Sequence, residues 1–105
     1  MEEKKGNTIS GRLAGSLFRS QITFAGFILS LNTTALYHLG ELSHPETRQK
    51  VVDLELVKHT IDTITLLREK TKGNLDKDES ELIANILYDL KLRYVAASDK
   101  SFRAK

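Results

Sequence analysis

Apolar residues recur along three stretches of the chain at steps of three and four, not at steps of two. Proline, which interrupts helices, occurs once, at Pro45, between the first and second of these stretches. Both observations favour α-helix over β-strand. The pattern therefore predicts an all-α chain of three helices, over residues 24–39, 54–72 and 77–97.

The first predicted helix contains no charged residue, since the nearest ones are Arg19 before it and Glu41 after it. Leu29 and Leu36 lie off its main apolar stripe, so the helix is apolar nearly all round. Such a helix needs to be buried nearly all round. A chain of this size makes only a small core by itself. We therefore expect this helix to pack in the core of an oligomer.

Small residues follow one edge of the same helix, with Gly26, Ser30 and Thr34 at four-residue steps. This spacing lets another helix approach closely, and that helix belongs either to a second copy or to the same subunit. The stretch is too short and too polar for a transmembrane span, which needs about 20 apolar residues. The predicted oligomer interface consists of Phe24, Gly26, Phe27, Ile28, Ser30, Leu31, Thr34 and Ala35.

The ends of the helices carry residues suited to capping. A threonine or aspartate before the first turn accepts a hydrogen bond from a free backbone N–H, and a glycine after the last turn adopts the left-handed conformation. An Asp-x-x-Glu pair at the start of the third helix fits an acidic capping box. The predicted cap and turn residues are Thr23, Gly40, Asp53, Gly73, Asp76 and Glu79.

Residues 69–80, EKTKGNLDKDES, join the second and third helices. A phosphate-binding loop has several glycines ahead of a Lys-Ser/Thr pair, and a calcium loop has regularly spaced oxygen ligands over about twelve residues. Neither pattern is present. The stretch is therefore predicted to be a tight turn, and so short a connection predicts an antiparallel hairpin of the second and third helices.

Composition bounds the class of protein. The chain has 105 residues, no cysteine and a formal net charge of +2. The absence of cysteine excludes disulfides and thiolate metal sites. The small net charge argues against nucleic-acid binding as a primary role. We expect a flexible basic N-terminal arm over residues 1–22, a helical domain over residues 23–97 and a flexible C-terminal tail over residues 98–105. The first residues do not resemble a signal peptide, which favours the cytoplasm.

Few side chains are candidates for catalysis or metal binding. His59 has Glu55 and Asp62 within one helical turn, and such a set can bind a transition metal. The Glu-x-x-His pattern that bundle metal sites repeat on two helices is missing, however, so an ion-pair cluster at the surface is expected. No nucleophile motif occurs. We predict no catalytic residue, no cofactor and no metal site.

Four segments carry a resemblance to a known family: TFAGFILSL and ALYHLGE in the first helix, VDLELVKHTIDTITLLREKTKGNL across the second helix and the turn, and LYDLKLRYV in the third. Over residues 23–96 the chain resembles a bacterial family known as domain of unknown function 1844. The resemblance implies a small, bacterial, cytoplasmic, all-helical protein. It implies no activity and no functional residue.

These observations favour a self-associating interaction or structural module without catalysis, with a homodimer preferred over a tetramer. An unidentified protein partner for the first helix is a further option. One alternative is a small-molecule or metal-binding protein that uses a cavity near Tyr37, His38 and Glu41. Another alternative is an accessory factor that contacts nucleic acid or a membrane through its basic ends, with salt-sensitive binding.

Overall fold

The computed structural model describes residues 22–43 and 47–104. These described residues form three helices, α2 (Phe24–His38), α3 (Leu54–Lys70) and α4 (Lys77–Ala104). Among the described residues there is no strand, only an isolated antiparallel bridge between Leu39 and Val52. The all-α prediction is confirmed. The predicted N-terminal arm, residues 1–22, lies outside the described residues except for Ile22.

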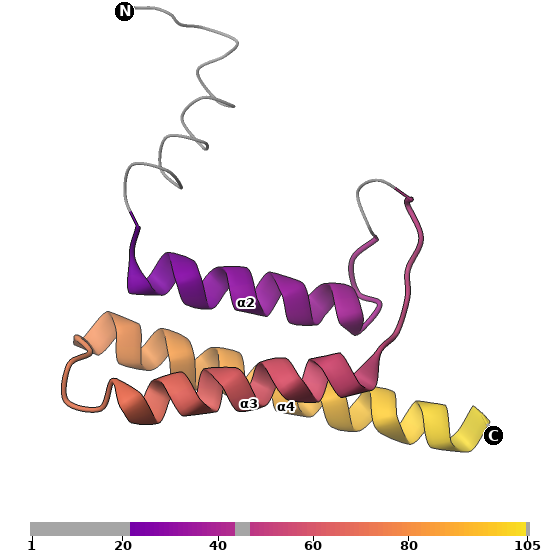
Figure 1. Cartoon of the computed structure of the whole chain (residues 1–105). Helices are drawn as coiled ribbons and strands as arrows, with labels where there is room; N and C mark the ends of the chain where they lie inside the picture. Colours follow the sequence, from indigo (N-terminus) through magenta and orange to yellow (C-terminus); the bar gives the residue numbers. More distant parts are fainter. Residues whose placement is uncertain (1–21, 44–46, 105) are drawn as a thin grey trace, which may run out of the picture.

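Each of the three helices contacts the other two. The chain runs along α3 to the turn and returns along α4, while α2 lies along one side of this pair (Figure 1). The C-terminal end of α4 extends beyond the start of α3 (Figure 1). The last turns of α4 are therefore covered less than its middle.

A core of aliphatic side chains fills the space between the helices. Every helix contributes to it, because each has apolar residues at the three- and four-residue steps that place them on one face. The buried alcohol of Thr60 donates to the Leu56 carbonyl oxygen at 3.0 Å, which removes the cost of burying an unpaired hydroxyl. The buried core residues are Ile28, Ala35, Leu39, Val57, Ile61, Ile64, Ile83, Ile86, Leu87 and Leu90.

The predicted N-caps are confirmed. The hydroxyl oxygen of Thr23 accepts from the N–H of Gly26 at 2.9 Å. The carboxylate of Asp53 accepts from the N–H of Leu56 at 3.1 Å. Each bond satisfies one of the donors that the first turn of a helix leaves free.

Gly40 closes α2, as predicted, with a φ of +79°. Its N–H donates to the Tyr37 carbonyl oxygen at 3.0 Å, and the N–H of Glu41 donates to the Leu36 carbonyl oxygen at 3.0 Å. These two bonds form a Schellman motif, which requires a left-handed residue at this position. The N–H of Asp53 donates to the His38 carbonyl oxygen at 2.7 Å, so the end of α2 is also tied to the start of α3.

The turn between α3 and α4 contains the predicted capping box. The Asp76 carboxylate accepts from the Glu79 N–H at 2.7 Å, and the Asp76 N–H donates to the Glu79 carboxylate at 2.9 Å. Gly73, with a φ of +87°, lies in a turn that is closed by a 2.8 Å bond from the Asn74 N–H to the Thr71 carbonyl oxygen. Both glycine and capping-box predictions are confirmed.

Three helix ends differ from the prediction. The first two helices end earlier, at His38 and Lys70, because the chain tightens into the turns that Gly40 and Gly73 form. The third helix continues to Ala104, past the predicted end at Ala97. No glycine or proline follows Ala97, and an Arg103–Asp99 ion pair of 3.3 Å bridges one turn of this extension. Most of the predicted tail, residues 98–105, is thus part of α4.

Candidate interaction surface

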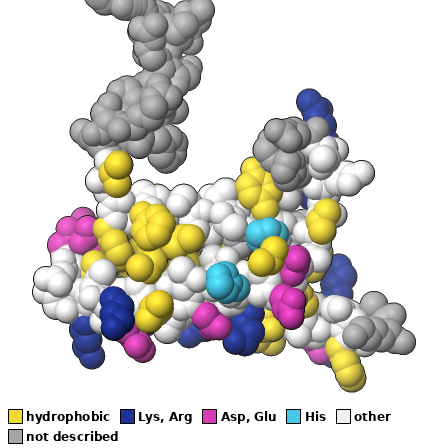
Figure 2. Space-filling view, viewed as in Figure 1, with side chains coloured by type: hydrophobic (Ala, Val, Ile, Leu, Met, Phe, Trp, Pro, Cys, Tyr) yellow, Lys and Arg dark blue, Asp and Glu magenta, His cyan; other side chains and the backbone are white. Residues whose placement is uncertain are grey.

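The side of α2 that faces away from α3 and α4 has no charged side chain. We define the outer α2 face as Phe27, Leu29, Ser30, Thr33 and Thr34, all of which are exposed. Phe27 and Leu29, at its two edges, each expose 47% of their surface. Hydrophobic side chains gather over the N-terminal half of α2, whereas the charged side chains in this view lie mainly along α3 and toward the margins (Figure 2).

The hydroxyl groups of this face are already hydrogen-bonded within the helix. Ser30 donates to the Phe27 carbonyl oxygen at 2.7 Å, Thr33 to that of Leu29 at 3.1 Å and Thr34 to that of Ser30 at 3.1 Å. Helical serines and threonines commonly bond in this way. A partner that covers the face therefore does not leave these hydroxyl donors unpaired, which lowers the cost of burying them.

The structure divides the predicted interface between the core and the surface. Ile28 and Ala35 have no exposed surface and fill the core of the same chain. Phe24 and Leu31 are half-buried and pack against that core. The periodicity grouped these four residues with Phe27 in one apolar stripe. The structure packs the four against the core and leaves Phe27 exposed.

The remaining predicted interface residues lie toward the outside. Phe27, Ser30 and Thr34 are exposed, and Gly26, one turn before Ser30 on the same side of the helix, is half-buried. A Cβ at Gly26 would lie 3.0 Å from the Thr23 hydroxyl oxygen, so this glycine also leaves room for the N-cap. The prediction missed Leu29 and Thr33. The available signal was their position around the helix, since Leu29 lies about 100° and Thr33 about 140° from Ile28.

The sequence of α2, α3 and α4 matches a known protein family. The family model described as "Domain of unknown function (DUF1844)" matches residues 21–96, which cover α2, α3 and α4 as far as Ala96. The chain belongs to this family. No curated protein and no solved structure matches the chain. Within this DUF1844 chain, the outer α2 face lies inside the matched region.

The charged residues around His59 on α3 form an ion pair at the protein surface. Lys58 and Asp62 form a 2.9 Å ion pair, and the hydrogen bond from Lys58 to Asp62 raises the pKa of the Lys58 ammonium. Asp62 is thus engaged by a cation rather than directed at His59. Among residues 22–43 and 47–104, no group of three or more histidine or acidic side chains is arranged to hold a metal ion.

The three residues proposed for a small-molecule cavity are split between two places. Tyr37 and His38 line a groove of about 430 Å³ together with Leu42, Val51 and other residues. Glu41 instead lies 3.4 Å from the Arg93 guanidinium, which also bonds Asp89 at 2.8 Å. Nδ1 of His38 is buried without a hydrogen-bond partner in the part of the chain that the structure describes. The groove is lined by both apolar and polar side chains.

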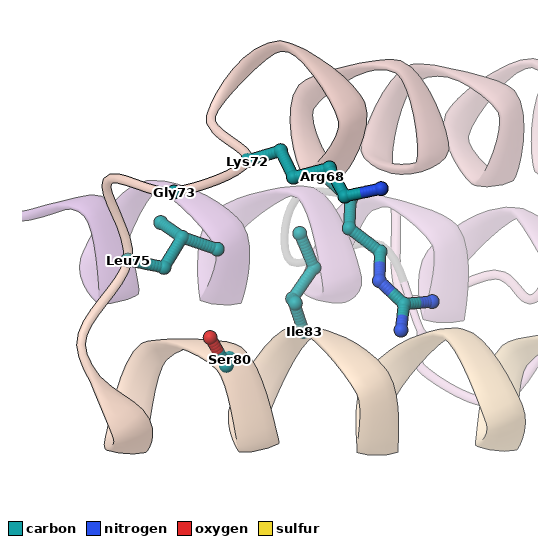
Figure 3. Close-up of a pocket in the computed structure, with 6 residues that line it drawn as sticks. All are labelled: Arg68, Lys72, Gly73, Leu75, Ser80 and Ile83. Atoms are coloured by element: carbon teal, nitrogen blue, oxygen red, sulfur yellow. The ribbon is translucent and has the colours of Figure 1, made fainter.

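A smaller pocket of about 160 Å³ lies beside the turn between α3 and α4. Ile83, which is 1% exposed, contributes to its apolar part. The side chains of Arg68 and Lys72 extend to one side, while the Ser80 hydroxyl lies on the other (Figure 3). Because these polar groups do not converge on one point, the pocket lacks the geometry of a phosphate cradle.

None of the helices within residues 22–43 and 47–104 has both the length and the apolar composition that crossing a membrane requires.

Proposed function

We propose that this protein is a self-associating interaction module without catalysis, and that two copies pair through the outer α2 face. In this proposal α3 and α4 form an antiparallel hairpin that supports α2 from one side, and the second copy covers the other side. The family resemblance supports a bacterial, cytoplasmic setting as part of the same proposal.

The absence of charge from the outer α2 face carries the proposal. An exposed helix face in a small soluble domain normally carries charged side chains. Here Phe27 and Leu29 flank a strip of small residues whose hydroxyls are bonded to their own helix. Small residues at a helix surface let a second backbone come close, so that van der Waals contacts form over the whole strip.

A charge introduced at the edge of this face tests the proposal. Phe27→Asp places a carboxylate where the second copy would exclude water, which costs several kcal/mol when the charge is unpaired. We expect light scattering to give a lower mass for this variant than for the wild-type protein. Circular dichroism should show an unchanged helical content, because Phe27 is half-exposed and contributes little to the core.

Leu66→Asp is the matched control. Leu66 is 55% exposed on α3, outside the proposed interface, and the substitution adds the same charge to an apolar surface position. Its mass should equal that of the wild-type protein. If Phe27→Asp and the wild-type protein have the same mass at every concentration, the outer α2 face does not mediate self-association.

A further inference from the structure

The helix α4 carries a second apolar stripe on the side away from the core. Ile83, Ile86, Leu87 and Leu90 face inward and are buried. The outward side of an amphipathic helix is normally polar, yet four large hydrophobic side chains of α4 are open to solvent. They are Tyr88 at 70%, Leu92 at 54%, Val95 at 62% and Phe102 at 77% exposure.

The spacing of these residues is that of a coiled-coil seam. Leu92 follows Tyr88 by four residues and Val95 follows Leu92 by three, and the same two steps lead through Asp99 to Phe102. Steps of four and three place side chains in one line along a helix. We define the outer α4 stripe as Tyr88, Leu92, Val95, Asp99 and Phe102. The one charged member, Asp99, interrupts an otherwise apolar line.

We propose that the outer α4 stripe pairs with the same stripe of a second copy, with the two helices antiparallel. A parallel pair in register would place Asp99 opposite Asp99 in the seam, where like charges repel. An antiparallel pair centred between Leu92 and Val95 places Leu92 against Val95. It also places Tyr88 against Asp99 of the other copy.

The contact of Tyr88 with Asp99 suits the chemistry of both groups. Oδ2 of Asp99 lies 3.3 Å from Nε of Arg103 on the same helix. Its other oxygen has no partner among the described residues and is available to accept from the phenol hydroxyl of Tyr88. The antiparallel arrangement thus gives the charged member of the stripe a hydrogen-bond donor in place of a second carboxylate.

The area of the stripe is sufficient for a specific contact. Its four large side chains offer on the order of 500 Å² of exposed surface in each copy. Complete burial of two such stripes covers roughly 1,000 Å², the threshold above which a contact between copies is considered a biological interface. The stripe also lies on a helix of 28 residues, so neighbouring side chains along the seam add to this area.

The outer α4 stripe shares no residue with the outer α2 face. A copy can therefore use both faces at once, and two isologous interfaces on one subunit produce assemblies larger than a dimer. This inference goes beyond the proposed function and does not depend on it. Loss of one interface leaves the other intact, so the two proposals can fail separately.

The mass of the protein in solution tests whether the outer α4 stripe mediates pairing. We expect light scattering to give more than twice 11.8 kDa for the wild-type protein, and a lower mass for Val95→Asp. Ser101→Asp adds the same charge at another exposed position of α4, away from the stripe, and should keep the wild-type mass. Combining Val95→Asp with Phe27→Asp should give a monomer.

Three results have distinct meanings. A wild-type mass for Val95→Asp overturns the α4 pairing, and a monomeric wild-type protein overturns both pairings. A wild-type mass for Phe27→Asp alone overturns the α2 pairing and leaves the α4 pairing standing. Should Val95→Asp lose helical content by circular dichroism, Val95→Ser replaces it, since serine removes the apolar contact without adding charge.

Disulfide crosslinking tests the orientation, because the chain contains no cysteine of its own. In the antiparallel pair Asn85 faces Phe102 of the other copy and lies far from the other Asn85. An Asn85→Cys chain mixed with a Phe102→Cys chain should therefore form a mixed disulfide dimer on mild oxidation. Crosslinking of Asn85→Cys to itself, without the mixed dimer, would show a parallel pair and overturn the proposed arrangement.

Discussion

A Cβ atom at Gly40 would lie 2.9 Å from Cγ2 of Val52, closer than side chains approach without displacement. The two residues meet because the loop after α2 returns to α3 through the bridge between Leu39 and Val52. Gly40 also has a φ of +79°, a conformation that side chains disfavour. Both the local turn and the returning chain thus require glycine.

Gly40→Ala should destabilise the fold more than Gly73→Ala. Gly73 has a φ of +87° but nothing within 4 Å of an added Cβ, so alanine there costs only the backbone strain of about 1 kcal/mol. At Gly40 the contact with Val52 adds to that strain, for a loss of roughly 2–3 kcal/mol. Urea unfolding followed by circular dichroism measures both. Equal losses would show that Val52 moves aside freely.

The capping box predicts that Asp76 contributes more to stability than the nearby Asp78. Asp76→Ala removes the acceptor for the Glu79 N–H, and the free energy of unfolding should fall by about 1 kcal/mol. Asp78→Ala changes the charge near the same helix end, where the dipole effect at an exposed position is only about 0.3–1 kcal/mol. Denaturant midpoints compare the two variants. A larger loss for Asp78→Ala would contradict the assignment of the cap.

Replacing Asn32 with an apolar residue should stabilise the protein. The Oδ1 atom of Asn32 is buried without a hydrogen-bond partner among the described residues. Asn32→Leu removes this unpaired acceptor and should raise the free energy of unfolding by about 1 kcal/mol. Asn32→Asp should act in the opposite direction, because it buries a charge at the same point. Thermal unfolding of the two variants checks this; a lower melting temperature for Asn32→Leu would contradict it.

Two adjacent residues of α2 should respond differently to protein concentration. Ile28 has no exposed surface, so Ile28→Ala should cost about 2–5 kcal/mol at every concentration through the cavity that it leaves. Phe27 is 47% exposed, and Phe27→Ala should weaken association instead. The difference in melting temperature between Phe27→Ala and the wild-type protein should then vary with concentration. If the difference in melting temperature from the wild-type protein varies with concentration in the same way for Phe27→Ala and Ile28→Ala, Phe27 has no role in association.

Local features of the fold could be predicted from the sequence. Thr23, Asp53 and Asp76 cap their helices because a short side-chain oxygen reaches an N–H two or three residues later, whatever the rest of the chain does. The reach of such a bond is fixed by backbone geometry alone. Gly73 was predictable on the same basis, since the turn that it forms involves only its immediate neighbours.

The end of α4 was less predictable. The apolar period of its inner face ends near Ala97, but the helix continues to Ala104 because nothing in the sequence interrupts it. A periodic pattern marks where a helix is buried, not where it ends. Val95 illustrates the same limit, since it is an apolar residue within the predicted helix, yet the structure exposes 62% of its surface.

The sequence by itself therefore determined that the described residues form three helices, where each of the three begins and which glycines close the turns. Only the tertiary structure decided which side of α2 is internal, so that Ile28 and Ala35 enter the core while Phe27 and Leu29 stay exposed. It also separated Glu41 from His38 by pairing Glu41 with Arg93. Capping depends on bonds within one turn, whereas burial depends on which other helices cover a face, and that requires all three helices at once.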